Sequence, residues 1–269
     1  MSESIISAEN VVKRFGKITA VDGISFDVQA GEIFAFLGPN GAGKSTTIKM
    51  LTTMLRPTEG VLALAGYDVT KHQDAARQAF GIVFQDPSLD EELSAYENME
   101  LHGVLYGVPK ANREARIREL LELVELWARK DSMVKTFSGG MRRRLEIARG
   151  LLHEPKVLFL DEPTLGLDTQ TRNLMWDYVK KLSHEKGMTI FFTTHYLDEA
   201  EDVADRIAII DHGKIVAHGT TPQLSKQTGT QTLEAAYLKL TGDTLRDEAE
   251  IGNNDGLNAR MARRNQSLR

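Results

Sequence analysis

Hydrophobic and polar positions along this chain form two recurring patterns. The first is a set of short, mostly apolar runs rich in β-branched and aromatic residues. Runs of this length and composition are typical of strands buried on both faces of a parallel sheet. They lie at Ile33–Leu37, Gly81–Phe84, Val157–Leu160, Thr189–Thr193 and Ile207–Ile210. A further run, Ile24–Val28, alternates apolar and polar side chains and predicts a strand with one exposed face.

The second pattern consists of longer segments with helical spacing, which separate the apolar runs. They are Ser45–Leu55, Arg113–Leu126, Arg142–Leu152, Gln170–Lys186 and Leu197–Ala204. Strands and helices that follow one another in this way predict an α/β fold with a mainly parallel sheet.

Two regions depart from the alternation. From about Leu89 to His153 the segments are helix-like and no convincing strand occurs, so we expect a helical insert at about residues 88–153 within a unit of residues 1–220. We expect residues 221–242 to form a C-terminal helical extension. The stretch Ile251–Arg269 is polar and has no aromatic residue, so residues 243–269 are predicted to be a disordered tail.

Composition narrows the classes of function. Of the 269 residues, 41% are hydrophobic and 26% are charged, as in soluble globular proteins. The formal net charge of −5 argues against a protein that mainly coats nucleic acid, because such domains are usually strongly basic. The lack of cysteine excludes disulfide scaffolds, thiolate zinc sites and cysteine nucleophiles. No apolar run reaches the roughly 20 residues of a membrane span, and no secretory signal is evident, so we expect a soluble cytoplasmic chain.

The most specific motif directly follows the strand Ile33–Leu37. It matches the pattern G-x-x-x-x-G-K-[ST] and leads into a predicted helix. Glycines let successive backbone N–H groups turn toward phosphate oxygens, and the helix N-terminus favours negative charge. We expect Lys44 to contact the β- and γ-phosphates and the Ser45 hydroxyl to bind Mg²⁺. The residues predicted to hold the nucleotide here are Gly38, Pro39, Asn40, Gly41, Ala42, Gly43, Lys44, Ser45 and Thr46.

Two carboxylates, Asp161 and Glu162, end the strand Val157–Leu160. Ligands of open α/β sheets bind at the carboxyl ends of the strands. Asp161 is therefore placed to hold Mg²⁺, directly or through water. Glu162 lies one residue further on, points elsewhere and could polarise an attacking water molecule.

A serine followed by two glycines, Ser138-Gly139-Gly140, opens another predicted helix and forms a second anion-binding helix start. With its motifs in this order, the chain resembles the ATP-binding-cassette (ABC) ATPases, and the triplet is similar to their LSGGQ signature. Phe137 stands where the signature has Leu, and Met141 stands where it has Gln. Both departures spare the three residues that are able to contact phosphate.

The resemblance covers residues 4 to about 220 and implies roles for further residues. Phe15 corresponds to an aromatic residue that stacks on adenine. Gln85 corresponds to the Q-loop glutamine, which senses the γ-phosphate and Mg²⁺, and His195 to the switch histidine at the γ-phosphate. The run Leu165-Gly166-Leu167-Asp168 resembles the D-loop, which crosses to a partner subunit. The implied fold is a P-loop NTPase (RecA-like) sheet with an antiparallel β subdomain and a helical insert subdomain.

The resemblance implies ATP as the ligand and Mg²⁺ as its cofactor. The expected metal ligands are Ser45, Gln85 and Asp161. The expected catalytic residues are Lys44, Gln85, Glu162 and His195.

The resemblance also implies how the chain assembles. Two copies pair head to tail, and Ser138-Gly139-Gly140 of one copy closes on the ATP held by the other; ATP binding closes the pair and hydrolysis reopens it. Three runs are similar to the daunorubicin/multidrug-exporter branch, in which the ATPase serves a separate multi-span membrane permease: Gln85–Ser88, Ser138–Leu145 and Thr232–Gly242. We therefore expect an exporter subunit at the cytoplasmic face of the cell membrane, a homodimer as its simplest assembly, and no nucleic-acid partner.

Other classes of protein share the phosphate loop. A soluble ABC ATPase that acts on DNA or ribosomes is the main alternative, but DNA-repair members insert a long coiled coil and ribosome-associated members carry two cassettes, and neither occurs here. A P-loop kinase or GTPase needs neither the Ser138 helix start nor His195. The basic run Arg142-Arg143-Arg144 is interpreted as a solvated helix face, with phosphate support or a partner contact as alternatives.

Overall fold

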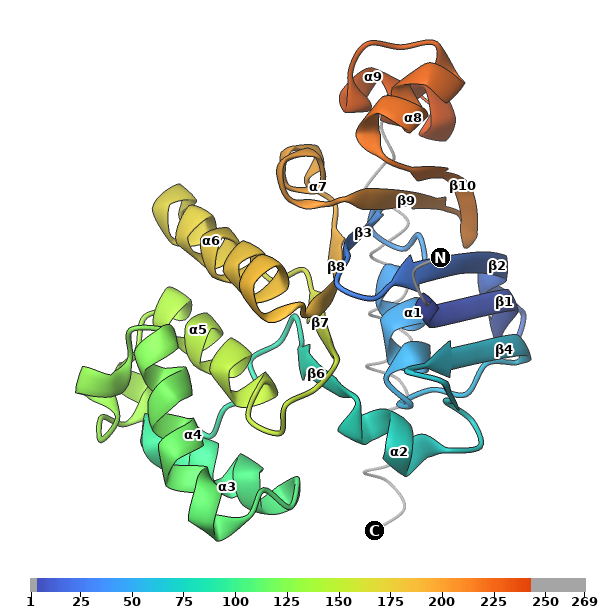
Figure 1. Ribbon diagram of the computed structural model, residues 1–269. Coiled ribbons are helices and arrows are strands. Elements are labelled where there is room, and N and C mark those ends of the chain that lie inside the picture. The colour runs from blue at the N-terminus through green and yellow to red at the C-terminus, as the bar shows by residue number, and fades with distance from the viewer. Residues whose placement is uncertain (1–3, 243–269) are drawn as a thin grey trace, which may run out of the picture.

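Two β-sheets of different kinds organise the chain, whose computed structural model describes residues 4–242 (Figure 1). The larger sheet has six strands in the order β10-β9-β3-β8-β7-β6. All neighbouring pairs in it are parallel except β9–β10. The strands are β3 (Ile33–Leu37), β6 (Phe80–Val83), β7 (Val157–Asp161), β8 (Thr189–Thr194), β9 (Arg206–Asp211) and β10 (Lys214–Gly219). The prediction of a mainly parallel sheet is confirmed, and the bounds of the five buried strands agree within one residue.

The central strands contribute to two separate cores. In β3, Phe34 and Phe36 pack on one side of the sheet, whereas Ile33, Ala35 and Leu37 pack on the other. Successive side chains of a strand point to opposite faces, so a strand covered on both faces needs apolar residues throughout. This requirement explains the continuous apolar runs in the sequence.

A smaller antiparallel sheet covers the Phe34 side, with its strands in the order β2-β1-β4-β5. Its strands are β1 (Ser4–Phe15), β2 (Ile18–Gln29), β4 (Glu59–Leu64) and β5 (Tyr67–Asp68). Helix α1 (Lys44–Leu51) contributes Ile48, Met50 and Leu51 to the core between the two sheets. The predicted strand Ile24–Val28 is part of the longer β2, because β2 continues along β1 as a hairpin.

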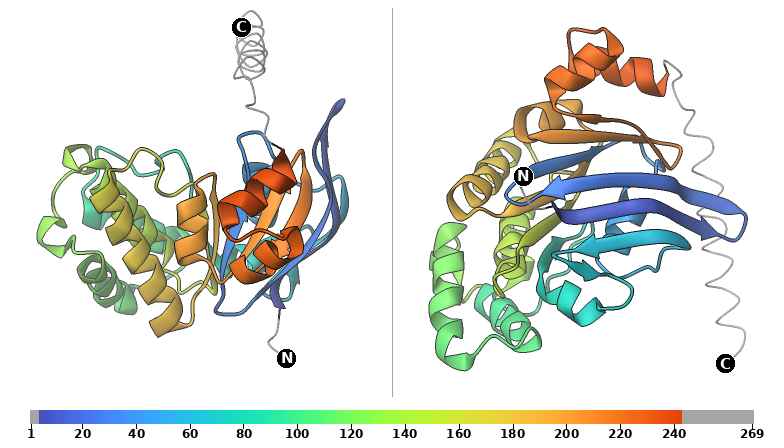
Figure 2. Two further views of the ribbon diagram at one scale, coloured as in Figure 1. Left: turned by 90° about the horizontal axis from the view of Figure 1, so that it is seen from above. Right: turned by 45° about the vertical axis from the view of Figure 1, so that its right-hand side comes forward.

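Helices cover the opposite face of the large sheet, as Figure 2 shows from above. They are α3 (Ala95–Leu105), α4 (Lys110–Leu123), α5 (Gly139–Gly150), α6 (Thr169–Lys186) and α7 (Leu197–Val203). Two short 3₁₀ helices, η1 (Trp127–Arg129) and η2 (Val134–Thr136), lie between α4 and α5. The described residues from Leu89 to His153 thus form helices and connections without a strand.

Capping residues define where several helices begin and end. Helix α5 begins at Gly139 with Ser138 as its N-cap, as the serine-glycine-glycine triplet predicts, and the Ser138 side chain accepts a hydrogen bond from the Met141 N–H at 3.3 Å. The helical spacing of apolar residues alone detected this helix only from Arg142. Asp168 caps α6 in the same way, and Gly187, with φ of 65°, ends it.

Shorter helices complete the described part of the chain. They are α2 (Gln73–Gln78), α8 (Thr221–Thr228) and α9 (Leu233–Thr241). Leu224 of α8 and Leu233 of α9 are buried in the helix-side core, so both helices pack onto the rest of the fold. Within residues 4–242 no helix is both long and apolar enough to cross a membrane. The tail predicted at residues 243–269 lies outside the described residues.

Candidate functional site

The carboxyl ends of four neighbouring parallel strands, β3, β8, β7 and β6, meet at one edge of the large sheet. The loop after β3 carries the glycine-rich motif, and the segment after β8 carries His195. Strand β7 ends in Asp161 and Glu162, and the segment after β6 carries Gln85. Parallel pairing therefore brings together residues that are far apart in the sequence.

A pocket of about 420 Å³ lies at this edge. It is lined by Ala20, Pro39, Asn40, Gly41, Gly43, Lys44, Ser45, Thr46, Gln85, Glu162, Leu165 and His195. All of these except Ala20 and Leu165 are residues that the sequence predicts for nucleotide binding or catalysis. Ala20 had no signal in the sequence, whereas Leu165 belongs to the run that resembles a D-loop.

Two glycines let the loop pass tightly beneath neighbouring strands. Gly43 has φ of 110°, and a Cβ at this position would lie 2.6 Å from the carbonyl oxygen of Ala20. A Cβ on Gly38 would lie 2.3 Å from the carbonyl oxygen of Ile210. Side chains are excluded at both positions, so the backbone N–H groups of the loop can face the pocket.

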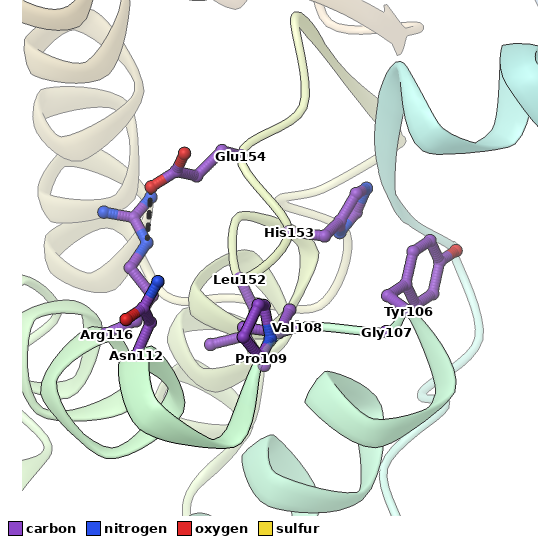
Figure 3. A pocket seen from close by; sticks show the side chains of 9 residues that line it. All are labelled: Tyr106, Gly107, Val108, Pro109, Asn112, Arg116, Leu152, His153 and Glu154. Atoms are coloured by element: carbon purple, nitrogen blue, oxygen red, sulfur yellow. Dashed lines mark ion pairs between the residues drawn. The ribbon is translucent and has the colours of Figure 1, made fainter.

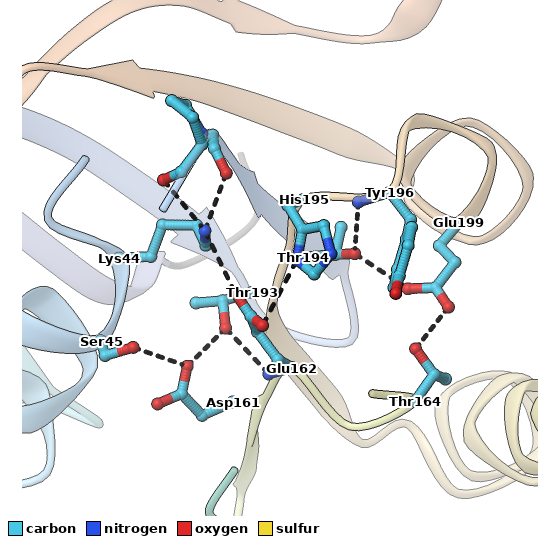
Figure 4. Close-up of polar contacts among 12 residues, drawn as sticks. Lys44, Ser45, Asp161, Glu162, Thr164, Thr193, Thr194, His195, Tyr196 and Glu199 are labelled. Atoms are coloured by element: carbon cyan, nitrogen blue, oxygen red, sulfur yellow. Dashed lines mark hydrogen bonds and ion pairs between the residues drawn. The ribbon is translucent and has the colours of Figure 1, made fainter. Parts of the chain in front are cut away.

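Lys44 lies at the floor of the pocket with 5% of its side chain exposed. Its Nζ donates hydrogen bonds to the carbonyl oxygens of Gly38, at 2.7 Å, and Pro39, at 3.2 Å, and lies 3.1 Å from Glu162 Oε1 (Figure 4). Burial lowers the pKa of Lys44, and the carboxylates of Glu162 and Asp161 oppose this shift. A buried ammonium beside these oxygens can bind phosphate when a ligand enters.

Glu162 has a strained backbone that turns its side chain into the pocket. Its φ of 45° lies in the left-handed region, which side chains with a Cβ rarely adopt. The Glu162 N–H donates to the Thr193 Oγ1 at 3.0 Å and lies 3.2 Å from the Thr193 carbonyl oxygen. The carboxylate then lies between Lys44 Nζ and His195 Nδ1, which is 3.3 Å from Glu162 Oε2.

Asp161 forms a cluster of oxygen atoms with two hydroxyl groups. Its Oδ1 accepts hydrogen bonds from Ser45 Oγ at 3.2 Å and from Thr193 Oγ1 at 2.6 Å. Together with the Gln85 amide, these hard oxygen donors suit Mg²⁺, which proteins often bind through one or two carboxylates and the phosphates of a substrate. Among residues 4–242, no group of three or more His, Cys, Asp and Glu could hold a metal ion by itself.

Thr193 and Thr194 contact carboxylates of the candidate site or next to it, although the sequence did not predict a role for them. Their signal was a pair of polar residues at the end of an otherwise apolar strand. Thr194 Oγ1 donates to the buried Glu199 Oε2 at 2.9 Å, and Thr164 donates to Glu199 Oε1. This buried network joins the loop of His195 to the segment that follows Glu162 (Figure 4).

Two predicted elements do not reach the pocket within one chain. Ser138 and Gly139 are exposed at the start of α5, and neither they nor Gly140 line the pocket. Phe15, at the end of β1, is 46% exposed, and Lys13 Nζ lies 5.0 Å from the centre of its ring. It does not line the pocket either.

The two departures from the signature sequence fill space in the helix-side core. Phe137 is buried there, and the Arg129 guanidinium lies 5.7 Å from the centre of its ring. Met141 is partly buried against the same core. Both side chains pack against the protein interior, so neither departure from the signature alters the exposed surface of Ser138 and Gly139.

The interpretation of the arginine run as a solvated helix face is wrong for Arg143. Arg142 and Arg144 are partly exposed, but Arg143 is buried. Consecutive helical residues point about 100° apart, so a run of three like residues spans different faces of the helix. The middle residue of this run faces the sheet.

A separate pocket of about 230 Å³ lies where α3, α4 and the end of α5 approach one another (Figure 3). It contains one ion pair between the residues that line it, Arg116 Nε to Glu154 Oε1 at 3.9 Å. None of the predicted site residues lines it. The edge pocket is therefore the candidate functional site.

Related sequences identify the family of this chain. A family model described as ABC transporter matches residues 21–165. The daunorubicin/doxorubicin resistance ATP-binding protein DrrA of Streptomyces peucetius is 45% identical over 245 residues, which are 91% of this chain and 73% of that protein. The Nod factor export ATP-binding protein I of Ralstonia nicotianae is 44% identical over 244 residues, 91% of this chain and 74% of that protein.

Solved structures give the same result. An ATP-binding subunit of an ABC transporter has a TM-score of 0.81 and 31% identity, covering 89% of this chain and all of its own (100%). A dimeric ATP-binding cassette bound to ADP and Pi has a TM-score of 0.72 and 28% identity, covering 80% of this chain and 98% of its own. These matches confirm the predicted P-loop NTPase fold. This chain therefore belongs to the ABC transporter family and is one of its ATPases.

Proposed function

We propose that this chain is the ATP-hydrolysing subunit of an exporter, that it works as a head-to-tail dimer, and that a separate multi-span permease carries the substrate. The observation that carries the proposal is the edge pocket. There the Glu162 carboxylate lies between two nitrogen atoms, 3.1 Å from Lys44 Nζ and 3.3 Å from His195 Nδ1. In this proposal the carboxylate lies beside the terminal phosphate of bound ATP.

In this proposal each pocket residue acts on the terminal phosphate of ATP. The Lys44 ammonium stabilises the charge that develops on the transferred phosphoryl group. The Glu162 carboxylate accepts a hydrogen bond from the attacking water and orients it, while His195 maintains the closed geometry. Ser45, Gln85 and Asp161 would hold Mg²⁺, which supplies positive charge to the phosphates.

The dimer part of the proposal rests on the exposed start of α5. Ser138 and Gly139 present a helix N-terminus to solvent, and such a terminus binds anions. A solved relative of similar fold is a dimer bound to ADP and Pi. We infer that Ser138, Gly139 and Gly140 of one copy contact the nucleotide held by the second copy. Phe15 of the copy that holds the nucleotide stacks on the adenine.

The export part is supported by the relatives and by one surface. Both relatives described above are named for drug resistance or for Nod factor export, and neither is named for work on DNA or ribosomes.

Tyr106, at the end of α3, lines a cavity together with Phe84 and Ser88, on either side of Gln85. The adjacent exposed side chains of α3 are apolar: Leu101, Val104 and Leu105. An apolar face beside the Gln85 segment suits a permease helix at the cytoplasmic side of the membrane.

Affinity purification of the tagged chain from gently solubilised host membranes, followed by mass spectrometry, tests the export proposal. We expect a stoichiometric multi-span membrane protein. Leu105 is 73% exposed, so Leu105→Asp should preserve the fold and ATP hydrolysis. The same change should lower recovery of the permease about tenfold, because a desolvated charge weakens an apolar contact by at least ~1.4 kcal/mol.

Two results would contradict the proposal. The first is recovery of the chain with ribosomes or DNA-repair proteins and with no membrane protein. The second is equal recovery of the membrane protein with the Leu105→Asp variant, which would contradict only the part of the proposal that assigns the docking surface to α3.

A further inference from the structure

Arg143, in the second turn of α5, joins two segments that end at the edge pocket. Its Nε donates to the Pro163 carbonyl oxygen at 2.7 Å, and its Nη2 donates to the Glu162 carbonyl oxygen at 3.3 Å. On the other side, Nη1 donates to the Phe84 carbonyl oxygen, and Nη2 lies 3.5 Å from the Gln85 carbonyl oxygen. One guanidinium thus binds four backbone carbonyl groups.

These contacts replace pairing that the sheet no longer provides. Strands β6 and β7 are neighbours, and the last residue pair between them is Val83 with Leu160. Beyond that pair β6 and β7 are no longer paired with each other, and each of the segments that follow them carries one residue of the pocket, Gln85 or Glu162. Arg143 connects the two segments just past the end of their strand ladder.

Glu146 provides the counterion and extends the connection. Its Oε2 lies 3.0 Å from Arg143 Nη1, and its Oε1 accepts a hydrogen bond from the Ser88 N–H at 2.8 Å. Only 8% of the Arg143 side chain and 2% of the Glu146 side chain are exposed. Replacing a buried ion pair by apolar residues is often neutral for stability. The main effect of this pair is therefore expected on the geometry of the pocket.

We propose that Arg143, with Glu146 as its counterion, is a positioning residue for ATP hydrolysis: it holds the segments of Gln85 and Glu162 at a fixed spacing. This inference rests on the catalytic roles proposed above for those two residues. The planar guanidinium has five N–H donors in a rigid arrangement and can span both segments, which a glutamine amide cannot do. Lys44 and Ser45 are not among the contacts of Arg143 that join these segments, so initial ATP binding does not depend on it.

The Arg143→Gln variant tests the inference through separate measurements of ATP affinity and turnover. We expect kcat to fall at least about tenfold, because a displacement of about 1 Å in a catalytic group lowers the rate by up to ~100-fold. The Kd for ATP should stay within about twofold of the original value, because the phosphate loop is unchanged.

Arg144→Gln is the matched control on the same helix. Arg144 Nη1 donates to the Val124 carbonyl oxygen at 3.0 Å and lies 3.4 Å from Glu125, so it stabilises the helical region away from the pocket. This variant loses the same charge, and its kcat should stay within about twofold of the original value. An equal fall of kcat in the two variants overturns the inference.

The double variant Arg143→Met with Glu146→Met separates positioning from folding. It removes both buried charges, so its Tm should exceed that of Arg143→Gln, which leaves Glu146 without its counterion. Its kcat should remain low, because no donor connects the two segments. Recovery of kcat together with Tm would mean that the pair acts only on stability, and would overturn the inference.

Glu162→Gln serves as the reference for the proposed function. If that variant hydrolyses ATP at the original rate, the catalytic assignment and the inference both fail. If it is inactive while the Arg143→Gln variant behaves like Arg144→Gln, only the positioning inference fails.

Discussion

Within residues 4–242, two glycine-bearing helix starts have similar local chemistry and different surroundings. Helix α1 begins after Gly43, enclosed by β2 and by the carboxyl ends of the sheet strands. Helix α5 begins after Ser138, which is exposed to solvent. Both starts direct unpaired backbone N–H groups outward, and both can attract an anion.

The difference shows what a motif can and cannot provide. At α1, the same chain supplies the buried Lys44 and the oxygen cluster around Asp161, so this start lies in a pocket with opposing walls. At α5, the chain supplies only the helix start, because Ser138, Gly139 and Gly140 do not line the edge pocket. The start of α1 therefore lies in a pocket of one chain, whereas the start of α5 belongs to a proposed site between two copies. Three variants test this contrast.

The largest effect is expected from Glu162→Gln in the α1 pocket. The amide keeps the size of the side chain but removes the negative charge beside Lys44 and His195. Steady-state hydrolysis should fall by about 10²–10³, the usual effect of removing one preorganised catalytic group. ATP should still bind, and gel filtration with ATP should show a stable dimer. Unchanged turnover would exclude Glu162 as the residue that orients water.

A somewhat smaller effect is expected from Gly139→Asp at the α5 start. The Cβ of a new side chain would lie 3.8 Å from Leu167 Cδ2, an ordinary contact, so the monomer should fold and bind ATP within about twofold of the original affinity. A carboxylate facing the phosphate of a second copy costs several kcal/mol, so hydrolysis should fall about 10²-fold.

Adding Gly139→Asp to Glu162→Gln sharpens this test. The dimer expected for Glu162→Gln with ATP should disappear in the double variant, whereas the neutral control Gly139→Ala should retain more of it. A dimer that persists with the aspartate would show that the α5 start does not face the nucleotide of a second copy.

The smallest effect is expected from Gly140→Ala, which tests packing beneath the α5 start. The new Cβ would lie 2.3 Å from Thr171 Cγ2, and Thr171 is held by a 2.8 Å hydrogen bond from its hydroxyl to Asp168. Overpacking of this kind costs about 1–3 kcal/mol, and each kcal/mol lowers Tm by about 2–4 °C. Adding Thr171→Ser removes the clashing methyl group and keeps the hydroxyl, so Tm should recover. A Tm that does not change in Gly140→Ala would contradict this packing.

Local patterns were sufficient for much of the fold and for part of the site. The five buried strands agree with their apolar runs within one residue, because a strand covered on both faces tolerates few polar side chains. Helix α4 begins at Lys110, three residues before the predicted start, because its first turn carries polar residues that helical spacing of apolar residues does not detect. All of the site assignments stay predictions, and those for Phe15 and for the signature residues concern residues that do not line the pocket of one chain.

The sequence by itself determined the order in which the candidate functional groups follow one another along the chain: a glycine-rich loop after one apolar run, two carboxylates after another, and a histidine after a third. Those features are local, because backbone conformation and the end of a strand depend on a few adjacent residues. Only the tertiary structure decided that Thr193 bonds Asp161 and that Arg143, alone among three consecutive arginines, is buried. Identical side chains on neighbouring helical positions differ only in the face they occupy, and that face acquires its environment when the helix packs against the sheet.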